Sequence, residues 1–352
     1  MTMNSEFHVG DPGALIAALP AVLGFVPEKS LVLVFLETSD QMGAVMRADL
    51  SDDLIANLDH LAQLAETSGA ERVVCVVVDA DGALCPMCND DHRRLCEALA
   101  DALRARGLGL HAAHVVDRVA AGGRWHCIDG CGRGGEVPDP YASPLAAAAV
   151  LDGRRLYGRR EDLAAVVASA DPARAAALQS RIEDCERRRE PRWQADPNGC
   201  GRRDVETAMA TAVAVSEGCE PGDDQIVQIA ASLADVAVRD TLYALAIGSV
   251  SGPAEALWAL LARTLPDPWR IEALVLLAFS AYARGDGPLA GVSLEAALRS
   301  DPRHRMAGML DSALQSGMRP EQIRELAGTG YRLARRLGVQ LPPRRGIGRR
   351  AV

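Results

Sequence analysis

The sequence has no hydrophobic run long enough to cross a bilayer. Its longest apolar stretches lie at 31–36 and 273–283, whereas a membrane-spanning helix needs roughly 20 consecutive apolar residues. Residues Met1–Glu6 also lack the basic and apolar segments with which an export signal begins. We therefore expect a cytoplasmic protein without a membrane-spanning segment.

A basic surface and a disulfide framework are absent too. The formal net charge of −9 argues against general nucleic-acid binding, because phosphates favour a basic face. The chain has nine cysteines, an odd number, and no export signal. Both observations argue against extensive disulfide bonding. We expect most thiols to be reduced, so that some are available to bind metal.

Lysine is nearly missing from the sequence. Lys29 is the only lysine among 38 basic residues, and all the others are arginine. Together with the abundant alanine and glycine, this pattern is explained by codon bias in a GC-rich genome, without any function for the arginines. Lys29 is then either a lysine retained without a function or an amine selected for binding.

Two common catalytic motifs do not occur. The sequence contains no Gly-x-Ser-x-Gly elbow of a serine hydrolase. Its glycine-rich segment 130–135 lacks the Gly-Lys-Ser/Thr ending and the strand-loop-helix spacing of a phosphate loop. These absences leave open whether the protein is an enzyme.

The first part of the chain reads as an α/β domain. Unbroken apolar runs at 30–36 and 72–79 suit strands that are covered on both faces. Leucines at helical spacing follow each run, and weaker strand signals come after them. The expected strands are 30–36, 44–49, 72–79, 112–116 and 124–128, and the expected helices start at 11, 51 and 90. This alternation predicts a mixed, three-layer α/β domain over 1–142.

The second part of the chain has almost no strand signal. We expect a helical connector over 143–203, with a linker at 190–203 because two prolines and an Asn-Gly pair occur there. An all-α domain follows over 204–340, and 341–352 reads as a disordered basic tail.

An internal period of 34 residues, the length of a tetratricopeptide unit, runs through the all-α domain. The matching positions are Ala256 with Ala290, Leu260 with Leu294, and Pro268 with Pro302. This period predicts tetratricopeptide-like helix pairs. Because only two units align, an irregular helical bundle is the alternative.

A Cys-x-x-Cys motif lies between a predicted strand and a predicted helix. Cys85 and Cys88 could bind zinc together with His92 and Cys96, which lie one helical turn apart. The order of strand, motif and helix is also that of a thioredoxin-like redox site, although the usual preceding Trp and a later X-Pro partner are missing. The simpler alternative is that Cys85 and Cys88 are loop thiols that bind nothing, and that Cys96 is an apolar residue of the core.

A second zinc arrangement pairs the same two cysteines, Cys85 and Cys88, with Cys127 and Cys131. The latter two follow a later strand and could be neighbours of the motif in space. Zinc is the cofactor that either arrangement would bind.

Polar residues at strand ends are candidates for binding a small ligand. Asp79 and Asp81 close a central strand, where carboxylates can hold magnesium or act as a base, although both residues are also ordinary loop formers. Lys29, Ser30, Asp79 and Trp125 are the candidate ligand-binding residues at the mouth of the sheet.

Three segments resemble a known family. The run from Leu15 to Val32, which reads LIAALPAVLGFVPEKSLV, is similar to the opening signature of the actinobacterial family called domain of unknown function four-one-nine-two. Trp125 with Cys127 and Cys131, and the segment 278–290, resemble later parts of that family.

The resemblance implies no established activity. Family members often carry a paired cysteine and a proline where this chain reads Cys131-Gly132-Arg133, which weakens the case for a shared metal site. Arginine also occurs at the position of Lys29 in the family, which weakens a role that needs a neutral amine.

The leading functional hypothesis is a non-enzymatic interaction or regulatory protein of the cytoplasm, whose helical part binds a protein or peptide partner. The alternative is a metal-dependent or thiol-based enzyme, centred on the loops of Cys85 and Cys88 and of Cys127 and Cys131.

Overall fold

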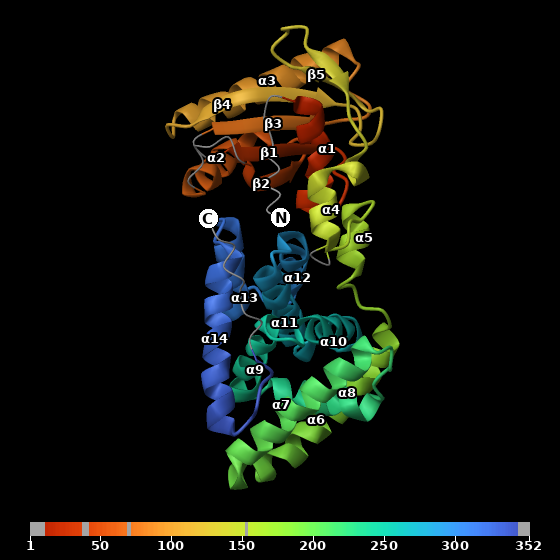
Figure 1. Cartoon of the computed structure of the whole chain (residues 1–352), viewed down its shortest axis with the longest axis vertical. Helices are drawn as coiled ribbons and strands as arrows, with labels where there is room; N and C mark the ends of the chain where they lie inside the picture. The colour runs from red at the N-terminus through yellow and green to blue at the C-terminus, as the bar shows by residue number, and fades with distance from the viewer. Residues whose placement is uncertain (1–10, 37–41, 69–71, 152–153, 344–352) are drawn as a thin grey trace. The chain divides into compact units, whose positions relative to one another are not determined.

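The computed structural model describes residues 11–36, 42–68, 72–151 and 154–343. The chain forms two compact units (Figure 1). The first comprises Met1–Leu163 with Gln315–Gly317, and the second comprises Ala164–Leu314 with Met318–Val352. Of the predicted basic tail, residues 344–352 lie outside the described residues. No helix in the described part of the chain has the length and apolar character that a membrane span requires.

The first unit is built on one mixed sheet of six strands in the order β2-β1-β3-β4-β5-β6. Only β3 and β4 pair in parallel, and the crossover between them contains helix α3 (Pro86–Arg104). The strands are β1 (Ser30–Leu36), β2 (Met42–Asp49), β3 (Arg72–Val78), β4 (Gly109–Val116), β5 (Arg124–Cys127) and β6 (Gly134–Glu136). The mixed α/β sheet predicted from the sequence is thereby confirmed.

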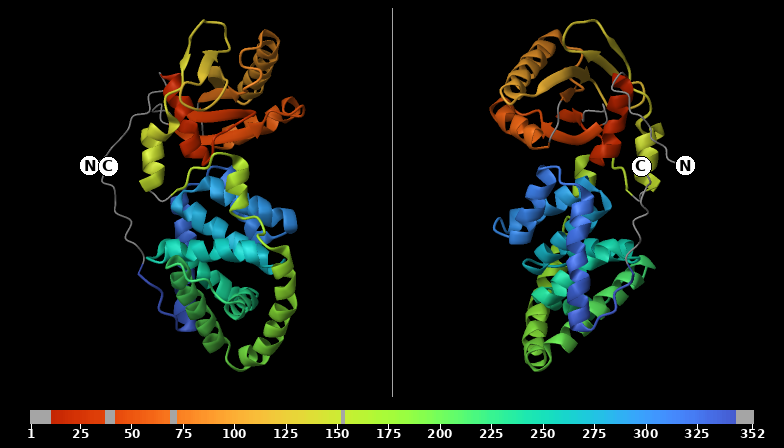
Figure 2. Two further views of the ribbon diagram at one scale, coloured as in Figure 1. Left: turned by 90° about the vertical axis from the view of Figure 1, so that its right-hand side faces the viewer. Right: turned by 60° about the vertical axis from the view of Figure 1, so that its left-hand side comes forward.

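Helices cover both faces of this sheet. Helices α2 (Leu58–Thr67) and α3 pack on one face, and α1 (Pro12–Leu23) lies on the other, which gives three layers (Figure 2). The central strands β1 and β3 are therefore buried along almost their whole length, as their unbroken apolar runs predict.

The chain then becomes helical. Short helices α4 (Pro144–Leu151) and α5 (Arg160–Ala165) follow the sheet. The second unit contains α6 (Pro172–Ala195), α7 (Pro197–Ser216), α8 (Asp223–Leu233), α9 (Val236–Leu242), α10 (Ser251–Thr264), α11 (Trp269–Arg284), α12 (Gly287–Ser300), α13 (Arg305–Gln315) and α14 (Pro320–Leu337). The core of this unit is centred on α11, which is buried on nearly all sides.

The structure has helix where the sequence predicts a linker. Helices α6 and α7 meet at Asp196, so residues 190–203 contain no extended segment. The Asp196 carboxylate accepts a hydrogen bond from the Gly199 amide at 2.8 Å, and Pro197 occupies the first helical position. The proline and polar residues that resemble a linker thus start a helix. The stretch 239–302, which carries the predicted period, contains α10, α11 and α12. Tetratricopeptide-like packing of these helices stays a prediction.

Candidate functional sites

One polar cluster lies where β3 ends. Asp79 follows β3, and Lys29 precedes β1, which is antiparallel to β3, so the two residues share one edge of the sheet. Lys29 Nζ is 3.2 Å from Asp79 Oδ1 and 2.9 Å from Asp81 Oδ2. On α3, His92 Nε2 is 3.2 Å from the other Asp79 oxygen. The structure therefore brings Lys29, Asp79 and Asp81 together and adds His92.

The charges in this cluster compensate one another. Hydrogen bonds to Asp81 and then to Asp79 raise the pKa of Lys29, so its side chain is an ammonium. Burial would raise the pKa of Asp79, but hydrogen bonds from Lys29 and the Gly82 amide bring it below its usual value. Lys29 is therefore not a neutral amine, and its charge leaves the two carboxylates with less attraction for magnesium.

Ser30 and Trp125 lie at the same end of the sheet, but their side chains have other partners. The buried Ser30 hydroxyl donates to the Glu28 carbonyl at 2.6 Å and accepts from Arg47 Nε at 2.8 Å. Trp125 lies on β5 with its ring edge-on to His114, 5.3 Å between ring centroids. Of the four residues predicted to bind a small ligand, Lys29 and Asp79 are thus in direct contact.

Cys85 and Cys88 lie at the start of α3. Cys85 is the N-cap residue and Pro86 occupies the first turn. Hydrogen bonds from the Cys88 amide and thiol lower the pKa of Cys85, and the interaction with Cys85 raises the pKa of Cys88. Cys96, which the first zinc arrangement requires, has its sulfur 3.9 Å from that of Cys75 in the core. With His92 also engaged by Asp79, the described structure does not gather those four ligands.

Cys127 and Cys131 come together with an aspartate. Ligand atoms of Cys127, Asp129 and Cys131 all lie within 4.8 Å of one another. His114 Nδ1, on the neighbouring strand β4, is 3.5 Å from Cys127 Sγ. No similar group of three includes Cys85 or Cys88 within the described ranges.

The backbone at these cysteines forms a tight loop. The Cys131 amide donates to Asp129 Oδ1 at 3.0 Å, and the Cys127 amide donates to the Arg133 carbonyl at 2.9 Å. Gly130 and Gly132 have φ values of 74° and 76°, which favour glycine. The Asp-Gly turn between the two cysteines therefore brings their sulfurs within 4.8 Å of each other.

Burial sets the protonation of the donors in this group. Burial, and then the charge of Arg133, lowers the pKa of His114 to about 4, so its ring is neutral and offers a lone pair. Burial, and then a hydrogen bond with Cys131, raises the pKa of Cys127 to about 11. Without a metal the Cys127 sulfur is therefore a thiol, and a metal ion would have to displace its proton.

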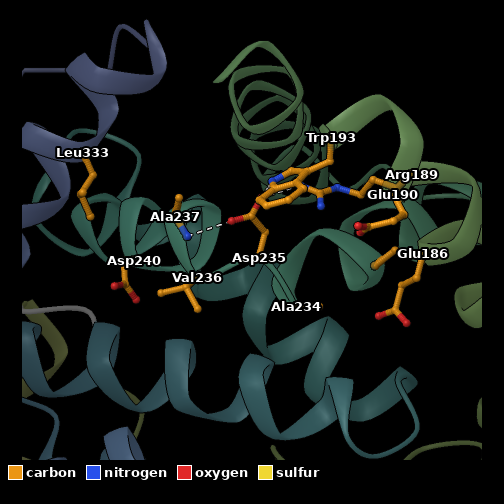
Figure 3. Close-up of a pocket in the computed structure, with 11 residues that line it drawn as sticks. Glu186, Arg189, Glu190, Trp193, Ala234, Asp235, Val236, Ala237, Asp240 and Leu333 are labelled. Atoms are coloured by element: carbon orange, nitrogen blue, oxygen red, sulfur yellow. Dashed lines mark hydrogen bonds and ion pairs between the residues drawn. The ribbon is translucent and has the colours of Figure 1, made fainter. Parts of the chain in front are cut away.

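The helical unit contains a cavity of about 740 Å³ (Figure 3). Residues of α6, α8, α9 and α14 surround it. They are Glu186, Arg189, Glu190, Trp193, Ala231, Ala234, Asp235, Val236, Ala237, Asp240 and Leu333. Four carboxylates and one guanidinium face this space, so the cavity is acidic.

Asp235 organises one wall of the cavity. Its carboxylate accepts hydrogen bonds from Trp193 Nε1 at 2.8 Å and from Arg189 Nη2 at 2.9 Å. It also accepts from the Ala237 amide at 2.9 Å, the contact dashed in Figure 3, and so caps α9. Arg189 donates to buried Asp204 at 2.7 Å as well. The indole and the guanidinium are thereby held in fixed positions.

The model of a family described as "Domain of unknown function (DUF4192)" matches residues 12–321. The chain belongs to the DUF4192 family. No curated protein and no solved structure matches the chain. Membership confirms the resemblance seen at Leu15–Val32 and brings no activity, so the function of this DUF4192 protein has to be argued from its sites.

The sequence did not predict Asp129 and His114 as partners of Cys127 and Cys131, and it did not predict the cavity. The Asp-Gly turn was a local signal for Asp129. His114 lies opposite Cys127 only through the register of β4 and β5, which a single sequence does not reveal. The cavity residues span 186–333, and no motif connects them.

Proposed function

We propose that this DUF4192 protein binds a protein or peptide partner through the cavity of its helical unit. The partner would insert an arginine or lysine side chain. The observation that carries the proposal is the acidic cavity itself, in which four carboxylates face about 740 Å³ of space beside Trp193. Opposite charge and an aromatic ring are what a cationic side chain on an apolar stem requires.

Asp240 is the carboxylate best placed to meet such a cation. Its closest cationic contact among the described residues is Arg239 Nε at 3.9 Å, which is too long for a hydrogen bond. Burial raises the pKa of Asp240. A bound guanidinium or ammonium would stabilise the ionised form, because an opposite charge offsets the loss of hydration.

Apolar surface accompanies Asp240. Val236, with 57% of its surface exposed, and Leu333 lie with Asp240 at one end of the cavity (Figure 3). The methylene stem of a lysine or arginine can pack on these two residues while its charged end meets the carboxylate. Glu186 and Glu190 lie at the other end, where a second cationic residue of the same peptide would bind.

Selection from a random peptide display library against the full chain tests this function. We expect enriched peptides to be rich in arginine and lysine, and this enrichment to disappear against the Asp240→Asn and Trp193→Ala variants. The matched control is Glu206→Gln, which removes an exposed carboxylate in the middle of α7 that does not line the cavity. Enrichment without charge preference, or none at all, would contradict the proposal.

A second candidate function is zinc binding at the loop of β5 and β6. The observation that favours it is the grouping of Cys127, Asp129 and Cys131, with His114 Nδ1 3.5 Å from the first sulfur. Thiolate, imidazole and carboxylate are the usual donors of four-coordinate zinc. An ion held there would tie this loop to β4 and stabilise it.

A further inference from the structure

The segment Leu84–Cys88 has features that neither partner binding nor zinc binding explains. Cys85 is the N-cap residue of the 19-residue helix α3, and Cys88 lies in the first turn of that helix. Neither residue belongs to the proposed zinc site. Two cysteines at this spacing, at the start of a helix, can form and break a disulfide with each other.

The two sulfurs differ in their surroundings. The Cys88 amide and thiol, and then the Met87 amide, donate hydrogen bonds to the Cys85 sulfur and lower the pKa of the Cys85 thiol. The interaction with Cys85, followed by burial and by the charge of Asp79, raises the pKa of Cys88. Cys85 is therefore suited to attack a disulfide, and Cys88 is suited to attack the mixed disulfide that forms on Cys85.

A buried acid–base pair adjoins the second thiol. His92 lies four residues after Cys88, on the same side of α3. Its Nε2 faces Asp79, and its Nδ1 has no hydrogen-bond partner among the described residues although the side chain is more than nine-tenths buried. An imidazole with one nitrogen anchored on a carboxylate and the other unoccupied is a candidate base for a thiol one helical turn away.

Apolar side chains flank the motif on the outside. Leu84 and Met87 are 70% and 79% exposed, although leucine and methionine are usually buried. They lie on either side of Cys85 in the sequence. A polypeptide with apolar residues around its own disulfide would pack on them and present its sulfurs to Cys85, whereas a small charged disulfide would not.

We infer that Cys85 and Cys88 form a redox-active dithiol that reduces a disulfide of a polypeptide substrate. The Cys85 thiolate attacks one substrate sulfur, the substrate S–S bond breaks, and the other sulfur leaves as a thiolate that takes up a proton. Cys88 then loses its proton to His92 and attacks the Cys85 sulfur, which releases the second substrate thiol. Two electrons pass to the substrate, and the dithiol becomes a disulfide.

The test uses the reduced full chain and an unfolded polypeptide with one disulfide as substrate. Mass spectrometry after acid quenching follows each cysteine. We expect oxidation to a Cys85–Cys88 disulfide with one substrate disulfide reduced for each chain oxidised. The Cys88→Ser variant should stop at a mixed disulfide on Cys85. A Cys219→Ser variant, which removes an exposed cysteine of the helical unit, should behave as the native chain.

Two further measurements separate the inference from a structural role. In the unmutated chain, Cys85 should react with iodoacetamide at pH 7 at least roughly ten times faster than Cys219. The His92→Gln variant should form the mixed disulfide at the native rate and resolve it more slowly. Equal alkylation rates, a mixed disulfide found first on Cys88, or one zinc ion bound to Cys85 and Cys88 would overturn the inference.

Discussion

At the scale of single residues, the structure shows how close packing fixes the polar cluster at the end of β3. Gly82 leaves just enough room for the Asp79 carboxylate and the His92 ring. A Cβ atom at position 82 would lie 2.2 Å from Asp79 Oδ2 and 3.0 Å from His92 Cε1. The contacts of Asp79 with Lys29 and His92 therefore depend on the absence of a side chain there.

The Gly82→Ala variant should lose about 1–3 kcal/mol of stability in the first unit, because Asp79 has to move from its partners. The measurement is alkylation of the fully buried Cys75 thiol in increasing urea, which reports opening of this core. Gly109→Ala is the matched control, since a Cβ there meets nothing within 4 Å. Equal effects of the two substitutions would contradict this account of Asp79.

Zinc binding at the loop of β5 and β6 should weaken as pH falls from 8 to 6. His114 is neutral above its pKa of about 4, and a hydrogen bond from Cys131 lowers the pKa of Asp129. Neither ligand therefore titrates between pH 6 and 8, whereas the Cys127 thiol, with a pKa of about 11, has to give up its proton to the solvent when the metal binds. Affinity should therefore fall at least roughly tenfold per pH unit, which competition with a chromophoric chelator measures.

Elemental analysis distinguishes the proposed zinc site from the arrangements that use the Cys-x-x-Cys motif. One zinc ion per chain is expected in the native protein and in a Cys85→Ser, Cys88→Ser double variant. The ion should be lost from a Cys127→Ser, Cys131→Ser double variant. Loss from the first double variant instead would assign the metal to the motif and refute the site at β5.

At the scale of elements, the sequence predicted those strands and helices whose position is determined by a local pattern of residues. The apolar runs predicted β1 and β3, and Asp11 with Pro12 predicted the start of α1. Strand β6, three residues with two glycines, has no strand pattern and was not predicted. The linker expected at 190–203 was wrong because proline and aspartate start helices as well as interrupt them.

The candidate sites show the same limit of sequence reasoning. Cys127 and Cys131 were predicted as zinc ligands together with Cys85 and Cys88, because they follow a later strand. His114 joins them only through strand register. The Lys29–Asp79 contact depends on β1 and β3 being antiparallel neighbours. The cavity depends on the packing of α6, α9 and α14, and such long-range packing leaves no periodic signal in one sequence.

Helices α6, α7 and α9 are joined by one buried charge network. Arg189 on α6 donates to Asp204 on α7 at 2.7 Å and to Asp235 before α9 at 2.9 Å. The Arg189→Gln variant should destabilise the helical unit by about 2 kcal/mol or more, because buried Asp204 loses its cation.

The matched control for Arg189→Gln is Arg187→Gln. Arg187 pairs with Asp184 one turn earlier on the exposed side of α6, and such surface pairs contribute at most about 1 kcal/mol. Urea denaturation followed by alkylation of buried Cys200 compares the two variants in this unit. Equal loss of stability would mean that the network does not hold the cavity wall.

At the scale of the whole molecule, the chemistry is divided between the two compact units. The first contains the dithiol, the Lys29–Asp79 cluster and the cysteine group, and the second contains the acidic cavity. The DUF4192 match covers all these residues except Leu333. Substitutions at Cys127 and Cys131 should therefore leave peptide binding unchanged, and substitutions at the cavity should leave zinc content unchanged.

The most direct test of the proposed function is the affinity of the most enriched cationic peptide for the full chain. Fluorescence anisotropy with the labelled peptide should show saturable binding to the native protein and to Glu206→Gln. Binding to Trp193→Ala and Asp240→Asn should be at least about tenfold weaker, the loss expected for a central contact residue. Equal affinity for all four proteins, or equal binding of a peptide with glutamate in place of each arginine, would contradict binding through this cavity.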